Sequence, residues 1–187
     1  MGALLTDPHL GKSPLGAEFV NTRGFSIVFR RSALEEVKAH FPYLAEFLTG
    51  SMFPASNAFY VNPLVLEGTS RVDTHVDCRL VASQNVRIIP NLVSVLYVEV
   101  DPSMLGGDLV LQVEPGRTFA IRPSTNDLLH FLGTLVHSVT PVESPSRRIS
   151  VVCEQYNLPE EVLEGFPEFQ VICDNDVAPR VSMSSAS

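Results

Sequence analysis

The sequence predicts a mainly β protein, a sandwich, jelly roll or barrel, with a helical segment ahead of the strands. From about residue 57 onward, apolar residues recur with a period of two in a series of short runs. Turn signals such as Gly106-Gly107 and Pro115-Gly116 separate these runs, and no helical pattern lies between them. Short strands in tandem are typical of all-β sandwiches and barrels.

Residues 32–50 show the pattern of an amphipathic helix, with apolar residues at helical spacing. Ser32 and Glu35 form a capping-box pair at its start, and Gly50 is suited to cap its end. Pro42 either kinks this helix or begins a second one in its first turn. The apolar residues at helical spacing are Leu34, Val37, Phe41, Leu44 and Phe47.

The remaining elements follow from the same reading. Residues 1–23 show no periodicity and are expected to be irregular, whereas residues 24–30 predict a strand. The polar tail from about residue 176 is expected to be flexible. Residues 1–187 are thus expected to form one domain, with its core motifs within residues 56–156. The later predicted strands are NAFYVNPLVLEG, VDTHVDCRLV, NVRIIP, LVSVLYVEV, DLVLQVE, RTFAI, NDLLHFL, LVHSVTPV and RRISVVCEQY.

Composition narrows the class of protein. The chain has 187 residues, 45% hydrophobic and 18% charged, values typical of a globular protein with a sizeable core. Its net charge of -8 argues against a nucleic-acid partner, and no apolar run reaches membrane-spanning length. No signal peptide is apparent. Three cysteines, Cys78, Cys153 and Cys173, lack framework spacing and predict reduced thiols in a cytoplasmic protein.

His75 and Asp77 lie two residues apart in the predicted strand RVDTHVDCRL. Positions i and i+2 of a strand share a face, so both side chains are expected to point toward whatever that face covers. Water, a hydrogen-bond network or a metal ion must satisfy them there. Two histidines and a carboxylate around one ion are the donor set of non-haem Fe(II) oxygenases. His130 and His137, in the late strands, are candidates for the second histidine.

Further residues at matching spacing complete a pattern. His137 follows Asp77 by 60 residues and precedes Arg148 by 11. This order resembles the Fe(II)/2-oxoglutarate-dependent dioxygenases, most closely their prolyl-hydroxylase-like branch, which carry His-x-Asp, a distal His and then an Arg. LVSVLYVEV followed by LGGDLVLQ, and RPSTNDLLHFLGTLVHSVTPV, are similar to further segments of that family. The resemblance covers residues 56–156.

The resemblance implies a double-stranded β-helix, that is, a cupin-like jelly roll with the N-terminal helix or helices buttressing one sheet. It implies Fe(II) bound by His75, Asp77 and His137, with 2-oxoglutarate and O2 as cosubstrates and ascorbate as an activator. The implied reaction hydroxylates a C–H bond of a peptidyl residue, an amino acid or a small molecule, and converts 2-oxoglutarate to succinate and CO2. His130 is then a core histidine or a neighbour of the site.

In the family, an Arg-x-Ser pair binds the distal carboxylate of 2-oxoglutarate. Arg148 and Ser150 share one face of their predicted strand and Arg147 lies on the other, so Arg148 and Ser150 are the expected pair. The planar, permanently charged guanidinium of Arg148 suits a carboxylate. Arg147 is expected to face solvent. Tyr97 has two interpretations, a hydrogen bond to the same carboxylate or packing in the core.

Other positions near the motif stay open. Similar enzymes carry a tyrosine ten residues before the first His, and here that position is Val65, with Tyr60 and Asn62 as nearby substitutes. Arg79, at the same parity as Asp77, is either a surface charge or a substrate contact.

Two other functional classes remain. One is a non-catalytic cupin-like metal- or ligand-binding module, which has no need of the dicarboxylate anchor that Arg148 offers. The other is a Zn- or Mn-dependent hydrolase or isomerase on the same barrel. In each case the expected partner is a small-molecule or peptidyl ligand, with no nucleic acid and no membrane.

Overall fold

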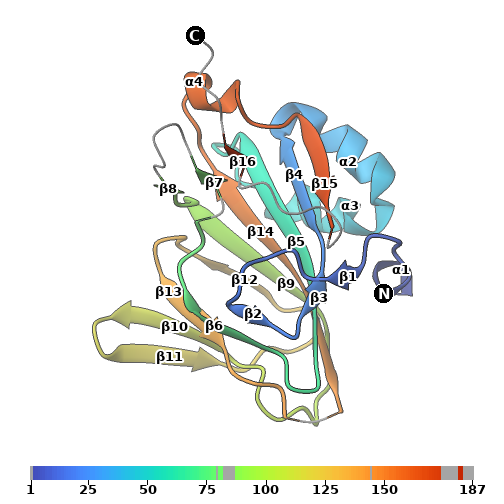
Figure 1. The fold of residues 1–187 in the computed structure, drawn as a ribbon, viewed down its shortest axis with the longest axis vertical. Coiled ribbons are helices and arrows are strands. Elements are labelled where there is room, and N and C mark those ends of the chain that lie inside the picture. The colour runs from blue at the N-terminus through green and yellow to red at the C-terminus, as the bar shows by residue number, and fades with distance from the viewer. Residues whose placement is uncertain (1, 79, 82–86, 144, 174–180, 183–187) are drawn as a thin grey trace.

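The computed structural model describes residues 2–78, 80–81, 87–143, 145–173 and 181–182. Two antiparallel sheets lie against each other, and helices cover the outer face of the larger one (Figure 1). This is the mainly β jelly-roll architecture that the sequence predicts. No helix in these ranges is long and apolar enough to cross a membrane.

The larger sheet, called the major sheet below, has the strand order β1-β3-β5-β14-β9-β12, with β4 beside β5 and β15 beside β4. At its centre, β5 and β14 pair along their whole length, from Arg147 opposite Glu67 to Tyr156 opposite Ala58. Its strands are β1 Gly11–Lys12, β3 Arg23–Gly24, β4 Ser26–Arg30, β5 Ala58–Glu67, β9 Leu92–Val100, β12 Leu128–Phe131, β14 Arg147–Tyr156 and β15 Phe169–Ile172.

The smaller sheet, called the minor sheet, has the order β11-β10-β13-β6-β2. Its strands are β2 Phe19–Val20, β6 Arg71–His75, β10 Leu109–Glu114, β11 Arg117–Ile121 and β13 Val136–Val139. Three two-residue strands form a separate small sheet, namely β7 Leu80–Val81, β8 Arg87–Ile88 and β16 Val181–Ser182. The predicted flexible tail thus contains a strand at β16, and the rest of it lies outside the described residues.

The predicted helical segment forms two helices rather than one. Pro42 begins the second helical segment, so of the two alternatives the kink is wrong. The capping box is also wrong, because the Ser32 hydroxyl donates to Glu168 instead of capping the helix. Gly50 lies inside the second helix rather than at its cap. The helical elements are α1 Gly2–Leu5, η1 Arg31–Ala33, α2 Leu34–His40, η2 Pro42–Leu44, α3 Ala45–Ser51 and α4 Glu160–Leu163.

Two further predictions need correction, and two elements were not predicted. The N-terminal residues 1–23 are not irregular throughout, because α1, β1 and β2 form there. Helix α4 and strand β15 follow the last predicted strand, and β15 extends the sheet by pairing with β4. Strand β6 ends at His75, so Asp77 lies beyond the strand and not within it.

Two apolar cores lie on the two faces of the major sheet. The outer core joins the helices to the sheet through residues such as Val37, Leu48 and Ile149, each 0% exposed. The inner core fills the space between the two sheets, with Val93 and Leu109 among its members. Because side chains of a strand alternate between faces, each central strand contributes to both cores.

Candidate metal centre

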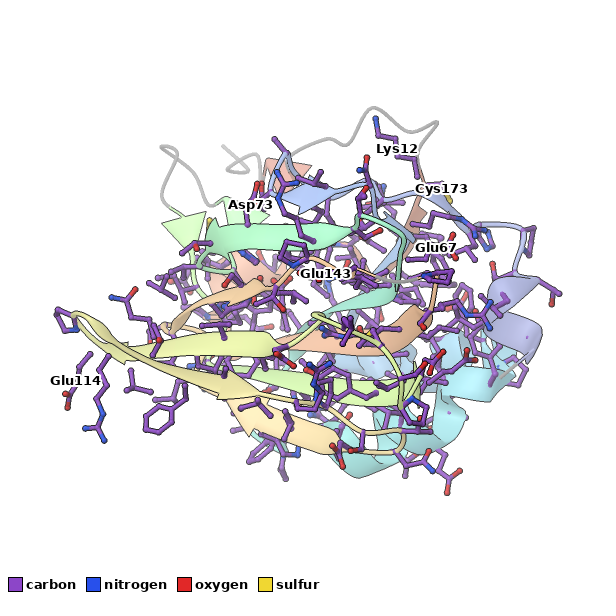
Figure 2. All side chains as sticks on the ribbon, turned by 90° about the horizontal axis from the view of Figure 1, so that it is seen from below. Lys12, Glu67, Asp73, Glu114, Glu143 and Cys173 are labelled. Carbon is purple, nitrogen blue, oxygen red and sulfur yellow. The ribbon has the colours of Figure 1, made fainter. Side chains whose placement is uncertain are left out.

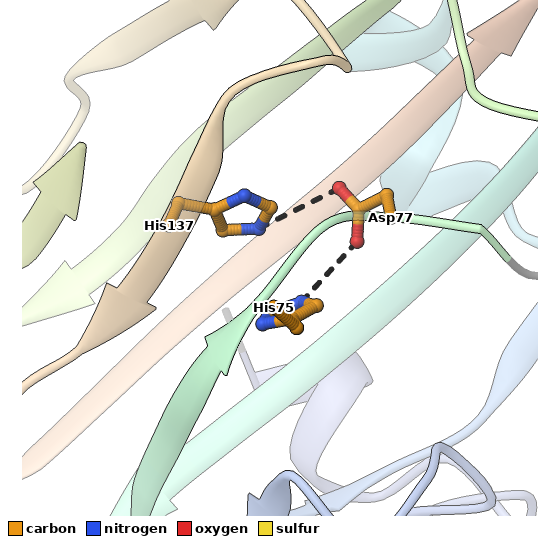
Figure 3. Close-up of side chains that lie close together, drawn as sticks. All are labelled: His75, Asp77 and His137. Atoms are coloured by element: carbon orange, nitrogen blue, oxygen red, sulfur yellow. Dashed lines mark ion pairs between the residues drawn. The ribbon is translucent and has the colours of Figure 1, made fainter. Parts of the chain in front are cut away.

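His75, Asp77 and His137 converge between the two sheets (Figure 3). His75 ends β6 and lies directly opposite His137 on β13. Their ring centroids are 4.3 Å apart. Nε2 of His75 lies 3.3 Å from Oδ1 of Asp77, and Nε2 of His137 lies 3.6 Å from Oδ2. Asp77 reaches this position from the segment after the strand, so strand parity is not what brings the carboxylate to His75.

Backbone carbonyls fix the orientation of both imidazoles through their Nδ1 atoms. Nδ1 of His75 lies 2.9 Å from the Asp73 carbonyl, and Nδ1 of His137 lies 3.0 Å from the Leu135 carbonyl. A carbonyl only accepts, so each Nδ1 carries a proton, and a neutral ring in this tautomer turns the lone pair of Nε2 toward Asp77. Lone pairs facing a carboxylate repel it unless a cation lies between them. Carbonyl-bound histidines and one carboxylate therefore fit a divalent metal ion.

The surroundings shift the pKa values of the two histidines in opposite directions. For His75, burial lowers the pKa, but the Asp77 carboxylate, the Asp73 carbonyl and Glu18 together outweigh it and the net pKa is raised. For His137, burial lowers the pKa and the adjacent His75 lowers it further, against the opposing charge of Asp77. A lowered pKa keeps His137 in the neutral form that a metal requires.

The candidate metal centre lines a pocket between the sheets, whose empty volume is about 520 Å³ including its mouth. Most of its lining is apolar, as expected for a small-molecule site. Phe19 contacts the His75 ring and Phe131 contacts the His137 ring, with centroid distances of 5.3 and 5.1 Å. Aromatic packing on both histidines limits the access of water to them.

Arg148 lies in the same pocket and is 3% exposed. Its Nη1 donates to the Gly107 carbonyl at 2.6 Å, and its guanidinium carbon lies 4.6 Å from the centre of the Tyr97 ring. Burial lowers the pKa of Arg148, while Tyr97 and Asp108 act in the opposite direction. Arginine does not lose its proton in proteins, so the pocket contains a buried cation.

Three donors near this cation have no hydrogen-bond partner among the described residues: Arg148 Nε, Ser150 Oγ and Tyr97 Oη. Ser150 pairs directly with Tyr97 across β14 and β9. Burial is the main cause that raises the pKa of Tyr97, so its hydroxyl keeps its proton and can donate. Each buried unsatisfied donor costs about 1–3 kcal/mol. An anion with several acceptor oxygens would satisfy all three.

Arg147 occupies the opposite face of β14. Its Nη2 lies 2.8 Å from Glu99 Oε1, and its side chain is 37% exposed. The two neighbouring arginines therefore lie where strand alternation places them. Arg147 forms an ion pair at the surface, and Arg148 lies in the pocket.

Arg122 supports the turn that carries the Gly107 carbonyl, a role that the sequence did not reveal. Its Nη1 donates to the carbonyls of Met104 and Gly106 at 3.0 and 2.6 Å, and its Nε lies 2.8 Å from Asp108. Gly106 has a φ of 72°, and a Cβ there would lie 1.7 Å from the Pro141 carbonyl oxygen. The turn therefore requires glycine at this position.

Several other candidates are distributed around the pocket or away from it. Asn62 lines the pocket, accepts from Ser26 at 2.7 Å and donates to Glu154 at 3.4 Å. Glu154, 2% exposed and also in the lining, was not predicted. Val65 packs in the outer core instead, on the opposite side of the sheet from the pocket.

His130, the other candidate for the second histidine, is not among the residues that line the pocket. His130 is exposed and lies 2.8 Å from the Ser94 hydroxyl, so it is not a core histidine. Arg79 lies outside the described residues.

The comparison with solved structures supports the fold. No family model matches the sequence, and no curated protein matches it. A prolyl-4-hydroxylase from Pseudomonas putida has a similar structure, with a TM-score of 0.50 and 16% identity over 82% of this chain and 76% of that one. A 2OG-Fe(II) oxygenase family protein from Burkholderia pseudomallei has a TM-score of 0.49 and 13% identity, over 73% and 67% of the two chains. The resemblance read from the sequence is confirmed at the level of fold, a double-stranded β-helix.

Proposed function

We propose that this protein is an Fe(II)- and 2-oxoglutarate-dependent oxygenase of the prolyl-hydroxylase-like branch. It hydroxylates a C–H bond of a peptidyl residue, an amino acid or a small molecule. One oxygen atom of O2 enters the new hydroxyl group and the other enters succinate, and the C1 carboxylate of 2-oxoglutarate leaves as CO2. The observation that carries the proposal is that a two-histidine, one-carboxylate cluster and a buried arginine with two orphan hydroxyls line one pocket.

The protein's own groups have distinct roles in this proposal. His75, Asp77 and His137 hold the iron, and their backbone hydrogen bonds keep both imidazoles in the ligating tautomer. Bound Fe(II) would supply the redox chemistry that couples oxidation of the substrate to decarboxylation. The apolar lining and the aromatic rings beside the histidines exclude water, which strengthens the electrostatic contacts within the pocket.

Arg148, Ser150 and Tyr97 bind the distal carboxylate of 2-oxoglutarate. The guanidinium supplies charge and directed N–H groups, and the two hydroxyls add one donor each. The Gly107 carbonyl already engages one arm of the guanidinium, which leaves the buried Nε side available for the carboxylate. A metal-binding module that takes no anionic ligand would leave these three buried donors unsatisfied.

Variants of the candidate ligands test the proposal. His137→Ala or His75→Ala should abolish succinate formation from 2-oxoglutarate and reduce Fe(II) binding by at least about 100-fold, because two remaining ligands hold the ion poorly. Circular dichroism should show a retained fold. Fe(II) binding is measured by anaerobic equilibrium dialysis, and succinate by mass spectrometry.

His130→Ala is the matched control, because this exposed histidine lies outside the pocket and should leave both measurements unchanged. Wild-type Fe(II) affinity in the His137→Ala protein would disprove the triad. Tight Fe(II) binding without succinate formation in a broad screen of peptides, amino acids and small molecules would favour the binding module instead.

A further inference from the structure

We infer that the inner face of the β10–β11 hairpin is the substrate-binding wall beside the metal centre, and that Phe119 is its distal contact. The substrate that fits this wall is an extended peptide with an apolar side chain near the residue to be hydroxylated. The inference rests on the proposed oxygenase function and names the substrate class for the same site.

Strand register connects Phe119 to the metal centre. His75 lies opposite His137, His137 lies opposite Leu111, and Leu111 lies opposite Phe119. Residues directly opposite each other in antiparallel strands project from the same face. The four side chains therefore form one row across β6, β13, β10 and β11. Since neighbouring strands are about 4.8 Å apart, Phe119 lies roughly 10 Å from His137 along this row.

Exposure increases along the hairpin from the pocket to solvent. On β10, Leu109 lines the pocket at 3% exposure, Leu111 is half-buried, and Val113 is 38% exposed. On β11, Phe119 is 49% exposed. Figure 2 shows the hairpin projecting from the body of the protein, with Glu114 near its tip. Apolar side chains thus extend from the pocket along the hairpin to exposed positions.

A single exposed phenylalanine is ordinary, and exposure alone would carry no weight. Phe53 illustrates this, since it is 48% exposed but makes an edge-to-face contact with His130, away from the pocket. Phe119 differs because it ends the row that contains both candidate histidine ligands. The guanidinium carbon of Arg117 lies 5.3 Å from its ring centre, a cation–π contact.

The geometry favours a peptide over a free amino acid. A ligand that reacts at the metal and touches Phe119 must extend roughly 10 Å, about three residues of an extended chain. The expected substrate therefore carries an apolar or aromatic residue about three positions from its target residue.

Selection from a library of random dodecapeptides tests the inference. The library is displayed on phage and bound to the protein loaded with Fe(II) and 2-oxoglutarate in the absence of oxygen. Enriched peptides should share an apolar or aromatic residue, and a synthetic copy should bind the Phe119→Ala protein at least about tenfold more weakly than the wild type. Phe119→Leu should retain part of the affinity because it keeps an apolar contact.

Phe53→Ala is the matched control and should bind the same peptide as tightly as the wild type. Equal affinity of Phe119→Ala and wild type, or failure to enrich any peptide, would overturn the inference. Calorimetric titration of Fe(II) and 2-oxoglutarate into the same preparations distinguishes failure of this inference from failure of the proposed function. If both ligands bind but Phe119→Ala does not change the peptide affinity, only the inference fails. If the wild type binds neither Fe(II) nor 2-oxoglutarate, the proposed function fails as well.

Discussion

The two faces of the major sheet are built by the same strands and differ in what they bury. On β14, Ile149, Val151 and Cys153 point toward the helices, and each is 0% exposed. Alternating with them, Arg148 and Ser150 point into the pocket at 3% and 1% exposure. Burial alone therefore does not distinguish the core from the site, because the side chains on both faces are almost fully buried. The chemical type of the buried groups makes the distinction.

The energetic consequences of the two faces are opposite. Burying the apolar side chains of the outer face stabilises the fold by about 1.5–3 kcal/mol per large residue. The inner face instead holds donors on Arg148, Ser150 and Tyr97 that no described residue satisfies, which costs stability. Such a cost is expected where a ligand supplies the missing partners. Substitutions on the outer face should accordingly change stability, and those on the inner face should change ligand binding.

The largest expected effect is the loss of 2-oxoglutarate affinity when Arg148, on the inner face, is replaced. Arg148→Ala should weaken 2-oxoglutarate binding by roughly 3–5 kcal/mol, about 150- to 4,000-fold, because it removes the buried partner of a carboxylate. Arg147→Ala should weaken it by less than about fivefold, because its ion pair with Glu99 lies at the surface. Isothermal titration calorimetry of 2-oxoglutarate into each Fe(II)-loaded variant gives both values. Similar losses in the two variants would disprove the assignment of Arg148 as the anchor.

The second largest expected effect is the loss of stability when Ile149, on the outer face, is replaced. Ile149→Ala should lower the free energy of unfolding by about 2–5 kcal/mol, because it opens a cavity in a fully buried apolar core. At a temperature where the variant stays folded, its affinity for 2-oxoglutarate should remain within about twofold of the wild type, since Ile149 points away from the pocket. Urea denaturation measures the first quantity and calorimetry the second. A large loss of affinity without a loss of stability would contradict the separation of the two faces.

The contrast between Arg147 and Arg148 also shows how far a sequence can be read. Strand alternation is a local property, so the β-rich run RRISVVCEQY predicts that the two arginines lie on opposite faces. The choice of Arg148 as the inward one comes from the resemblance to the family's Arg-x-Ser pair. The period-two runs likewise gave β5, β9 and β14 because propensity and burial agree within each strand.

Features that depend on distant partners were missed or predicted wrongly. The Ser32 hydroxyl was expected to cap a helix, but Glu168, 136 residues away, accepts its hydrogen bond. Asp77 reaches His75 from beyond the strand end, which alternation does not describe. The row that links His137 to Leu111 and Phe119 depends on register between strands, and a one-residue slip would turn each side chain to the other face.

The smallest expected effects come from substituting two buried serines, one on the pocket side and one within the fold. Ser150 and Ser26 are both buried serines, at 1% and 0% exposure. The Ser26 hydroxyl donates to Asn62 at 2.7 Å, whereas the Ser150 hydroxyl has no partner among the described residues. Ser26→Ala should therefore destabilise the protein by about 1–3 kcal/mol, because it leaves the Asn62 oxygen buried and unsatisfied.

Ser150→Ala should leave the free energy of unfolding unchanged within about 1 kcal/mol or raise it, because it removes a buried orphan hydroxyl without opening a large cavity. The same variant should bind 2-oxoglutarate about 10- to 100-fold more weakly, which corresponds to one lost hydrogen bond to a charged group of about 1.5–3 kcal/mol. Thermal denaturation without ligand and calorimetry with ligand separate these two terms. If Ser150→Ala instead destabilised the ligand-free protein as much as Ser26→Ala, its hydroxyl would have a structural partner, and the serine would belong to the fold and not to the binding site.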